Sequence, residues 1–231
     1  MESSVDVGPC QDLITNSTTR DNVLDFKNIL IIGDSMIHHA SKIAVERGAY
    51  LECCPGARTE HIKERLLKYE NHELTVIHIH VGTNNLRRGY RGGPGYNGGQ
   101  GKREALHNLA DLLFTAKTTF PNSEIFVNSI IIRSDINYKP LFDFNSQVEL
   151  MCNNFGVRFV EANCWVSRRH LARDGRHLNA RGVSRLSALF DSVLSAALRR
   201  IAQSATASDD TATMSESTVP ESPQVSGNGR A

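Results

Sequence analysis

The middle of the chain alternates between short apolar runs and segments whose apolar residues are spaced as on a helix. The apolar run at 29–32 ends at Gly33, and such an unbroken run is typical of a strand buried on both faces. Further along, Ile62, Leu66 and Leu67 are spaced to share one face of a helix. Because the two patterns follow one another several times, the sequence predicts an α/β fold.

The pattern predicts ten elements. The predicted strands are 28–32, 50–53, 74–81, 124–132 and 157–160. The predicted helices are 36–47, 60–69, 102–119, 141–154 and 179–201, the last of them capped by Asn179 or its neighbour. Five strands separated by helices imply a parallel sheet covered by helices on both faces, which is a three-layer α/β/α arrangement. In such sheets the functional groups lie on loops after the carboxyl ends of the strands.

Both ends of the chain are polar. Residues 202–231 are rich in Ser, Thr, Asp, Glu and Pro and contain no Leu, Ile, Phe, Tyr or Trp. Such a segment cannot bury enough apolar surface to offset its chain entropy, so we expect it to be disordered. Residues 1–25 are expected to form a polar tail. The sequence therefore predicts one folded domain over residues 26–201.

Composition narrows the function classes. The 26 Lys and Arg residues and the 25 Asp and Glu residues give a net charge of +1. This balance argues against a protein whose entire surface binds nucleic acid. The sequence contains no apolar run of the roughly 18 residues that cross a bilayer. Its first residues lack the basic start and apolar stretch of a secretory signal. We therefore expect a cytoplasmic protein without a transmembrane segment.

Residues suited to acyl transfer follow the predicted strands. Ser35 stands at a strand-to-helix turn and has the hydroxyl of a nucleophile. His177 can accept its proton, and Asp174, three residues earlier, can hold the imidazole tautomer. The backbone N–H groups of Ser35 and Gly56 and the carboxamide of Asn84 can donate hydrogen bonds to a developing oxyanion. The chain thus holds a complete set of groups for ester hydrolysis.

The blocks Gly33-Asp34-Ser35, Gly56, Gly82-x-Asn84 and Asp174-x-x-His177 resemble those of the SGNH/GDSL hydrolase family, in the family's order and across residues 26–200. The resemblance implies a flavodoxin-like, five-stranded fold and ester hydrolysis that needs neither metal nor cofactor. It also implies Ser35 as nucleophile, His177 as base and Asp174 as the orienting acid. Ser35, Gly56 and Asn84 would form the oxyanion hole.

Two further residues are candidates for substrate binding. Asp34 precedes the proposed nucleophile, and Asn85 follows the Asn84 block. The family usually has Asp where this chain has Asn85. The loss of a negative charge there can alter the hydrogen bonding of the loop, although an Asn side chain still accepts through its carbonyl.

A narrower resemblance concerns residues 78–84 and 174–182. They are similar to esterase domains in the first-open-reading-frame proteins of some LINE-type retrotransposons and to animal relatives of these. Three functions therefore stay open. They are a serine esterase acting on small acyl esters such as acetyl or short-chain lipid esters, a carbohydrate O-acetylesterase or thioesterase, and a binding module for RNA, lipid or protein.

The binding module would use the segment from Arg87 to Arg103. Seven of the thirteen residues at 89–101 are Gly, with Arg and Tyr between them. The segment lacks the residues of a phosphate-binding loop. It can be a flexible surface insertion, a flap over the active site, or an arginine-rich contact to single-stranded nucleic acid. The oligomeric state cannot be predicted from the sequence.

Two other clusters allow more than one interpretation. His78 and His80 share a face of a predicted strand, and a packed, hydrogen-bonded pair is favoured over a metal site because no further ligand has a matching spacing. A basic cluster surrounds His177, and it either attracts an anionic substrate or headgroup or forms a solvated face. Its members are Arg168, Arg169, Arg173, Arg176, Arg181 and Arg185.

Overall fold

The computed structural model describes residues 24–86 and 99–214. Within these residues the chain forms a sheet of five parallel strands in the order β2-β1-β3-β4-β5. The strands are β1 (Ile29–Gly33), β2 (Tyr50–Cys53), β3 (Val76–His80), β4 (Glu124–Asn128) and β5 (Arg158–Val160). The order reverses at β1, because the chain moves first to β2 on one side and then to β3 on the other. The predicted parallel α/β sheet is confirmed.

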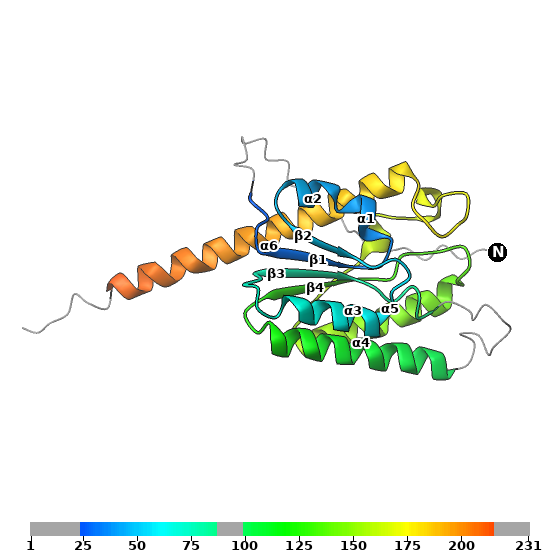
Figure 1. Ribbon diagram of the computed structural model, residues 1–231, viewed down its shortest axis with the longest axis horizontal. Coiled ribbons are helices and arrows are strands. Elements are labelled where there is room, and N and C mark those ends of the chain that lie inside the picture. Colours follow the sequence, from blue (N-terminus) through cyan, green and yellow to red (C-terminus); the bar gives the residue numbers. More distant parts are fainter. Residues whose placement is uncertain (1–23, 87–98, 215–231) are drawn as a thin grey trace, which may run out of the picture.

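Helices cover both faces of the sheet (Figure 1). They are α1 (Ile37–Ala40), α2 (Lys42–Glu46), α3 (Thr59–Leu66), α4 (Gly99–Thr119), α5 (Tyr138–Phe155) and α6 (Ala180–Met214). Short 3-10 turns are η1 (Leu67–Tyr69), η2 (Ala162–Cys164) and η3 (Arg168–His170). Among the described helices, none has the length and apolar content required to cross a membrane.

The side chains of β1 alternate between two cores. Ile29 and Ile31 pack with residues of α1, α2 and α6, whereas Leu30 and Ile32 pack with residues of α3, α4 and α5. All four side chains are fully buried. An unbroken apolar run therefore marks the strand because this strand lies in the middle layer and has no solvated face.

The fourth strand is shorter than predicted. The sequence predicts a strand over 124–132, but β4 ends at Asn128, although Ile130 and Ile131 beyond it are apolar and buried. Side-chain amides replace the ladder there, because the N–H of Ile130 donates to Asn145 Oδ1 (2.9 Å) and that of Ile132 to Asn163 Oδ1 (2.8 Å). The backbone after β4 is thus an ordered loop.

Two of the helices also differ from their predicted bounds. The predicted helix 36–47 is divided into α1 and α2 at Ser41. The helix predicted at 179–201 begins as expected, with Asn179 Oδ1 accepting the N–H of Gly182 at 3.0 Å, but it continues to Met214. Residues 202–214, predicted to be disordered, are therefore helical.

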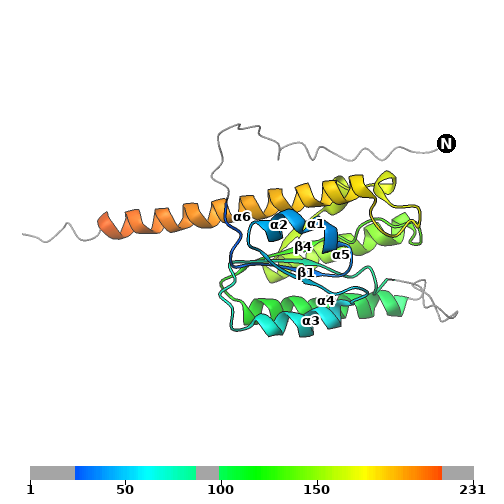
Figure 2. The same cartoon turned by 45° about the horizontal axis from the view of Figure 1, so that its top comes forward.

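The helical continuation has a local cause. Residues 202–214 include four Ala and neither Gly nor Pro. Ala has the highest helix propensity, and Gly and Pro, which most disfavour the interior of a helix, are absent from the segment. Figure 2 shows the end of α6, in orange, extending beyond the rest of the molecule. The predicted tails at 1–23 and 215–231 lie outside the described residues.

Candidate active site

Five of the expected site residues, including Asp34, line one pocket of about 310 Å³. Ser35 follows β1, Gly56 follows β2, and Asn84 follows β3, while His177 lies on the loop before α6. Parallel strands bring their carboxyl ends to one edge of the sheet, and the strand order reverses at β1, where a crevice is expected. The fold therefore brings together residues that lie far apart in the sequence.

The turn that carries Ser35 is fixed by its neighbour. Asp34 Oδ1 accepts the N–H of Met36 (3.0 Å), and the backbone N–H of Asp34 donates to the carbonyl of His80 (3.1 Å). Asp34 is 1% exposed, and its Oδ2 has no hydrogen-bond partner in the described part of the chain. Asp34 borders the pocket, but its side-chain hydrogen bond is to the N–H of Met36 and stabilises the turn. Ser35 itself is partly exposed.

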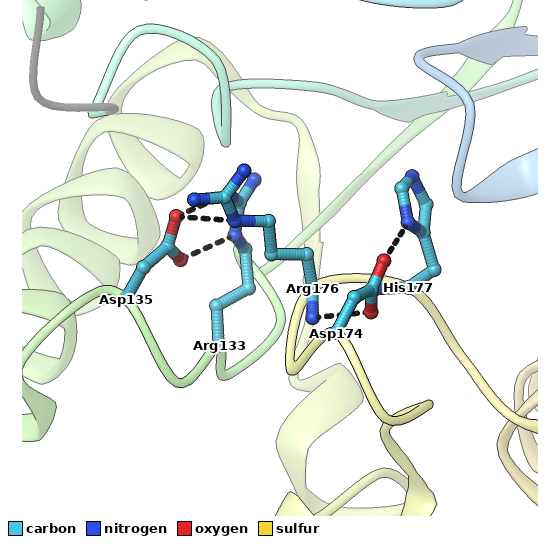
Figure 3. A network of polar contacts seen from close by, with 5 residues as sticks. All are labelled: Arg133, Asp135, Asp174, Arg176 and His177. Carbon is cyan, nitrogen blue, oxygen red and sulfur yellow. Dashed lines mark hydrogen bonds and ion pairs between the residues drawn. The ribbon is translucent and has the colours of Figure 1, made fainter. Parts of the chain in front are cut away.

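Asp174 and His177 form a hydrogen-bonded pair (Figure 3). His177 Nδ1 lies 2.5 Å from Asp174 Oδ2, while Asp174 Oδ1 accepts the backbone N–H groups of Arg176 (2.9 Å) and His177 (3.0 Å). The hydrogen bond from the Arg176 backbone, followed by those from His177, holds the pKa of Asp174 well below its usual range. The carboxylate therefore stays ionised and can fix the proton of the imidazole on Nδ1, which leaves Nε2 as an acceptor.

A tight turn sets the spacing of this pair. Leu171 and Leu178 form an antiparallel bridge, and between them Gly175 has a φ of +65°. A Cβ at Gly175 would lie 2.5 Å from the Oγ of Ser134. Only glycine combines this backbone conformation with so close an approach, so the turn that aligns Asp174 with His177 depends on it.

Three potential oxyanion donors border the pocket. Within the described residues, the backbone N–H groups of Ser35 and Gly56 have no hydrogen-bond acceptor. Gly56 has a φ of +74°, a conformation that L side chains rarely adopt. The Nδ2 of Asn84 donates one hydrogen bond to the carbonyl of Ala57 (2.9 Å) and retains a second N–H. These are the donors that the sequence predicts.

Asn85 lies outside the pocket lining and joins two loops. Its Oδ1 accepts the N–H of Thr59 (3.1 Å), and its Nδ2 is 3.1 Å from Thr59 Oγ1 and 3.3 Å from Glu60 Oε2. Burial raises the pKa of Glu60, but hydrogen bonds from its own backbone, Asn85 and Thr59 lower it to below its usual value. The amide of Asn85 thus fits beside an ionised carboxylate, where an Asp side chain would meet a like charge.

The sequence matches no family model and no curated protein, whereas the fold matches many solved structures. A GDSL-like lipase from Bacteroides thetaiotaomicron has 14% identity and a TM-score of 0.61, over 74% of this chain and 89% of its own. A carbohydrate acetylesterase from Sinorhizobium meliloti has 16% identity and a TM-score of 0.58, over 74% and 98%. A carbohydrate esterase of family 3 from Talaromyces cellulolyticus has 13% identity and a TM-score of 0.56, over 74% and 98%. The chain has the fold of GDSL-type hydrolases.

In this GDSL-type fold a buried chain of hydrogen-bonded polar side chains connects β3 and β4. His78 Nε2 is 2.8 Å from Asn128 Oδ1, and Asn128 Nδ2 is 3.1 Å from His80 Nδ1. Both imidazoles are buried, and desolvation lowers the pKa of His78 to about 4 and lowers that of His80. The predicted packed, hydrogen-bonded histidine pair is confirmed.

The sequence interpretation did not single out Arg133 and Asp135. Arg133 follows β4 and lines the pocket together with Arg176, a member of the predicted basic cluster. Arg133 is the first residue after the predicted strand 124–132. The rule that functional groups follow strand ends would have found it. The glycine-rich part of the Arg87–Arg103 segment, at 87–98, lies outside the described residues.

Proposed function

We propose that the protein is a serine ester hydrolase of the SGNH/GDSL type, with Ser35 as nucleophile, His177 as base and Asp174 as the orienting acid. The observation that carries the proposal is the single pocket lined by Ser35, Gly56, Asn84 and His177. The hydrogen bond between His177 and Asp174 supports the assignment of the base.

In the proposed reaction, Ser35 Oγ attacks the ester carbonyl carbon while His177 Nε2 takes its proton. The N–H groups of Ser35, Gly56 and Asn84 stabilise the negative charge that develops on the carbonyl oxygen. The C–O bond then breaks, and the alcohol leaves with the proton from His177. A water molecule, deprotonated by His177, hydrolyses the acyl-enzyme and releases the acid and free Ser35.

The substrates would be small acyl esters. A pocket of about 310 Å³ is near the lower end of the volumes of ligand sites, which favours an acetyl or another short acyl group. Two of the structural neighbours are named as carbohydrate esterases, which makes carbohydrate O-acetyl esters the second substrate class to test. The link to LINE-type esterase domains rests on residues 78–84 and 174–182 alone.

The test is hydrolysis of 4-nitrophenyl acetate by the purified full chain and by Ser35→Ala. Loss of the nucleophile should lower kcat by at least about 10³-fold. Ser146→Ala serves as the matched control, since Ser146 is exposed on α5 and does not line the pocket. Equal rates for the wild-type protein and Ser35→Ala would contradict the proposal, provided that both give the same circular dichroism spectrum. Acetylated xylo-oligosaccharides in the same comparison test the second substrate class.

A further inference from the structure

Two arginines from different loops meet at one carboxylate in the candidate active site. Arg133 donates from Nε to Oδ1 of Asp135 (2.8 Å) and from Nη2 to Oδ2 (2.7 Å). Arg176 has its Nε 3.1 Å from the same Oδ2. Figure 3 shows the two guanidinium groups together at Asp135, with Asp174 and His177 beside Arg176. Both arginines line the pocket that contains the proposed catalytic groups.

Arg133 has hydrogen-bonding capacity that the protein does not use. Its side chain is 8% exposed. A guanidinium carries five N–H donors, and Asp135 takes two of them. The other donors have no acceptor within the described part of the chain, although Arg133 borders the pocket. These free donors are not enclosed by the protein, because no Arg133 atom is both buried and unpartnered; they are open to the pocket, where acceptor oxygens of an occupant can reach them.

The arginines are held in place by the same loops that hold the proposed base. The backbone before Arg133 is fixed by side-chain amides, and the N–H of Ser134 donates to the carbonyl of Gly175 (2.8 Å). The N–H of Arg176 donates to Asp174 Oδ1 (2.9 Å). The guanidinium pair and the imidazole of His177 therefore have a fixed relation to each other, as a substrate site requires.

The pair also has an excess of positive charge. Two guanidinium groups share the single carboxylate of Asp135, so two positive charges face one negative charge in this cluster. The ionised Asp174 beside Arg176 directs its oxygens to His177 and to two backbone N–H groups, not to a guanidinium group. The other ionisable acid that borders the pocket is Asp34, which is buried at the base of the Ser35 turn and directs Oδ1 to the N–H of Met36. Guanidinium groups bind the oxygens of carboxylates and phosphates through paired hydrogen bonds.

We propose that the substrate carries an anionic group, a carboxylate or a phosphate, on its alcohol part and that Arg133 and Arg176 bind it. This inference rests on the proposed ester hydrolase function. The alcohol part is assigned because His177 gives its proton to the departing alcohol, and Arg176 is the next residue along the chain. The acyl group then occupies the side of the pocket formed by Gly56 and Asn84.

The catalytic test compares three phenyl acetates on the full chain, with the rate of Ser35→Ala subtracted. They are 4-acetoxybenzoate, 4-acetoxyphenyl phosphate and the neutral 4-acetoxybenzamide. We expect kcat/KM to be about tenfold higher for at least one anionic ester than for the amide, as befits a charge-assisted contact in a partly exposed site. The two anionic esters separate carboxylate from phosphate recognition.

Arg176→Gln should reduce this preference to about twofold or less, because one of the two guanidinium groups is lost. The matched control is Arg173→Gln, which removes an exposed arginine of the same loop that does not line the pocket. It should keep the preference of the wild-type protein. A wild-type preference near one, or a preference that survives Arg176→Gln, would overturn the inference.

A binding measurement separates this inference from the proposed function. Calorimetry on the full chain compares 4-acetamidobenzoate with 4-acetamidobenzamide, which are amides that lack the ester. The carboxylate should bind about tenfold more tightly, and Arg176→Gln should abolish the difference. Equal binding of the two amides refutes the anion site. If anion binding is observed but no hydrolysis depends on Ser35, the ester hydrolase function fails and the anion site stands.

Discussion

Asp174 is the residue whose contacts most constrain the proposed chemistry. Its carboxylate accepts two backbone N–H groups and lies 2.5 Å from His177 Nδ1. In Asp174→Asn, the side-chain amide can donate to Nδ1 and place the proton of the imidazole on Nε2, where it blocks the base. We predict that kcat for 4-nitrophenyl acetate falls about 10³-fold while KM changes less than about twofold.

The control for this prediction is Asp143→Asn, which changes an exposed acid on α5. It should retain the kcat of the wild-type protein. Nuclear magnetic resonance of the imidazole nitrogens would report the tautomer of His177 directly. An Asp174→Asn protein with a wild-type kcat would show that the His177–Asp174 pair has no part in catalysis.

At the scale of single residues, the sequence identifies site residues when a polar side chain directly follows an apolar strand. Ser35 and Asn84 stand out because each follows an apolar strand, where parallel topology exposes a residue at the edge of the sheet. Asp135 could not be found in this way, because its importance comes from contacts with Arg133 and Arg176 on separate loops. Such a pairing depends on tertiary structure and leaves no periodic pattern.

At the scale of elements, Asn85 connects the loop after β3 to the beginning of α3. The amide serves both Thr59 and the carboxylate of Glu60. Asn85→Asp keeps the acceptor for the N–H of Thr59 but places a second carboxylate against Glu60. We predict a loss of about 1 kcal/mol in the free energy of unfolding at pH 7, measured by urea denaturation.

A double-variant cycle identifies the cause of this loss. Glu60→Gln removes the like charge, so Asn85→Asp should cost less than about 0.5 kcal/mol in that background. If the cost is the same with Glu60 and with Gln at this position, the repulsion between the two carboxylates is not the reason for Asn85.

Element boundaries were predictable only where the local pattern and the tertiary contacts agree. β1 agrees with its prediction because its apolar run and its pairing with β2 and β3 end together at Gly33. The predicted strand 124–132 includes apolar residues beyond Asn128, but the N–H groups of Ile130 and Ile132 donate to the side chains of Asn145 and Asn163. The end of β4 therefore depends on two side-chain amides that are distant in the sequence, and the apolar pattern of the strand does not indicate them.

For the whole molecule, the buried histidine chain makes the stability of the fold depend on pH. Desolvation lowers the pKa of His78 to about 4 from an ordinary 6.5. Between pH 6.5 and pH 4, His78 is therefore mostly protonated in the unfolded chain and mostly neutral in the folded chain. The stability linked to His78 is complete above pH 6.5 and is lost as the pH falls toward 4, with about 2 kcal/mol lost by pH 5.

His80 is lowered in the same direction and adds to the effect. Urea denaturation at pH 7 and pH 5 should therefore show a drop of at least about 2 kcal/mol. His78→Gln retains an amide donor for Asn128 but cannot titrate, and its drop should be smaller by about 2 kcal/mol. Equal drops in the two proteins would mean that His78 is not the group responsible.

The overall topology was the most predictable property of the chain. Alternation of strands and helices implies parallel strands, and parallel strands place the loops that carry Ser35, Gly56 and Asn84 at one edge. The extent of α6 was not predictable from apolar periodicity, because residues 202–214 continue the helix although their sequence contains no Leu, Ile, Val or Phe.

The central claim is that Ser35 is a nucleophile activated by His177, and covalent labelling tests it most directly. A fluorophosphonate probe reacts with an activated serine, whose oxygen forms a bond to phosphorus as fluoride leaves. Peptide mass spectrometry of the labelled full chain should find the adduct on Ser35, with no adduct in Ser35→Ala and little in His177→Ala. An unlabelled Ser35 in the folded protein, or labelling of Ser35 that is undiminished in His177→Ala, would contradict the claim.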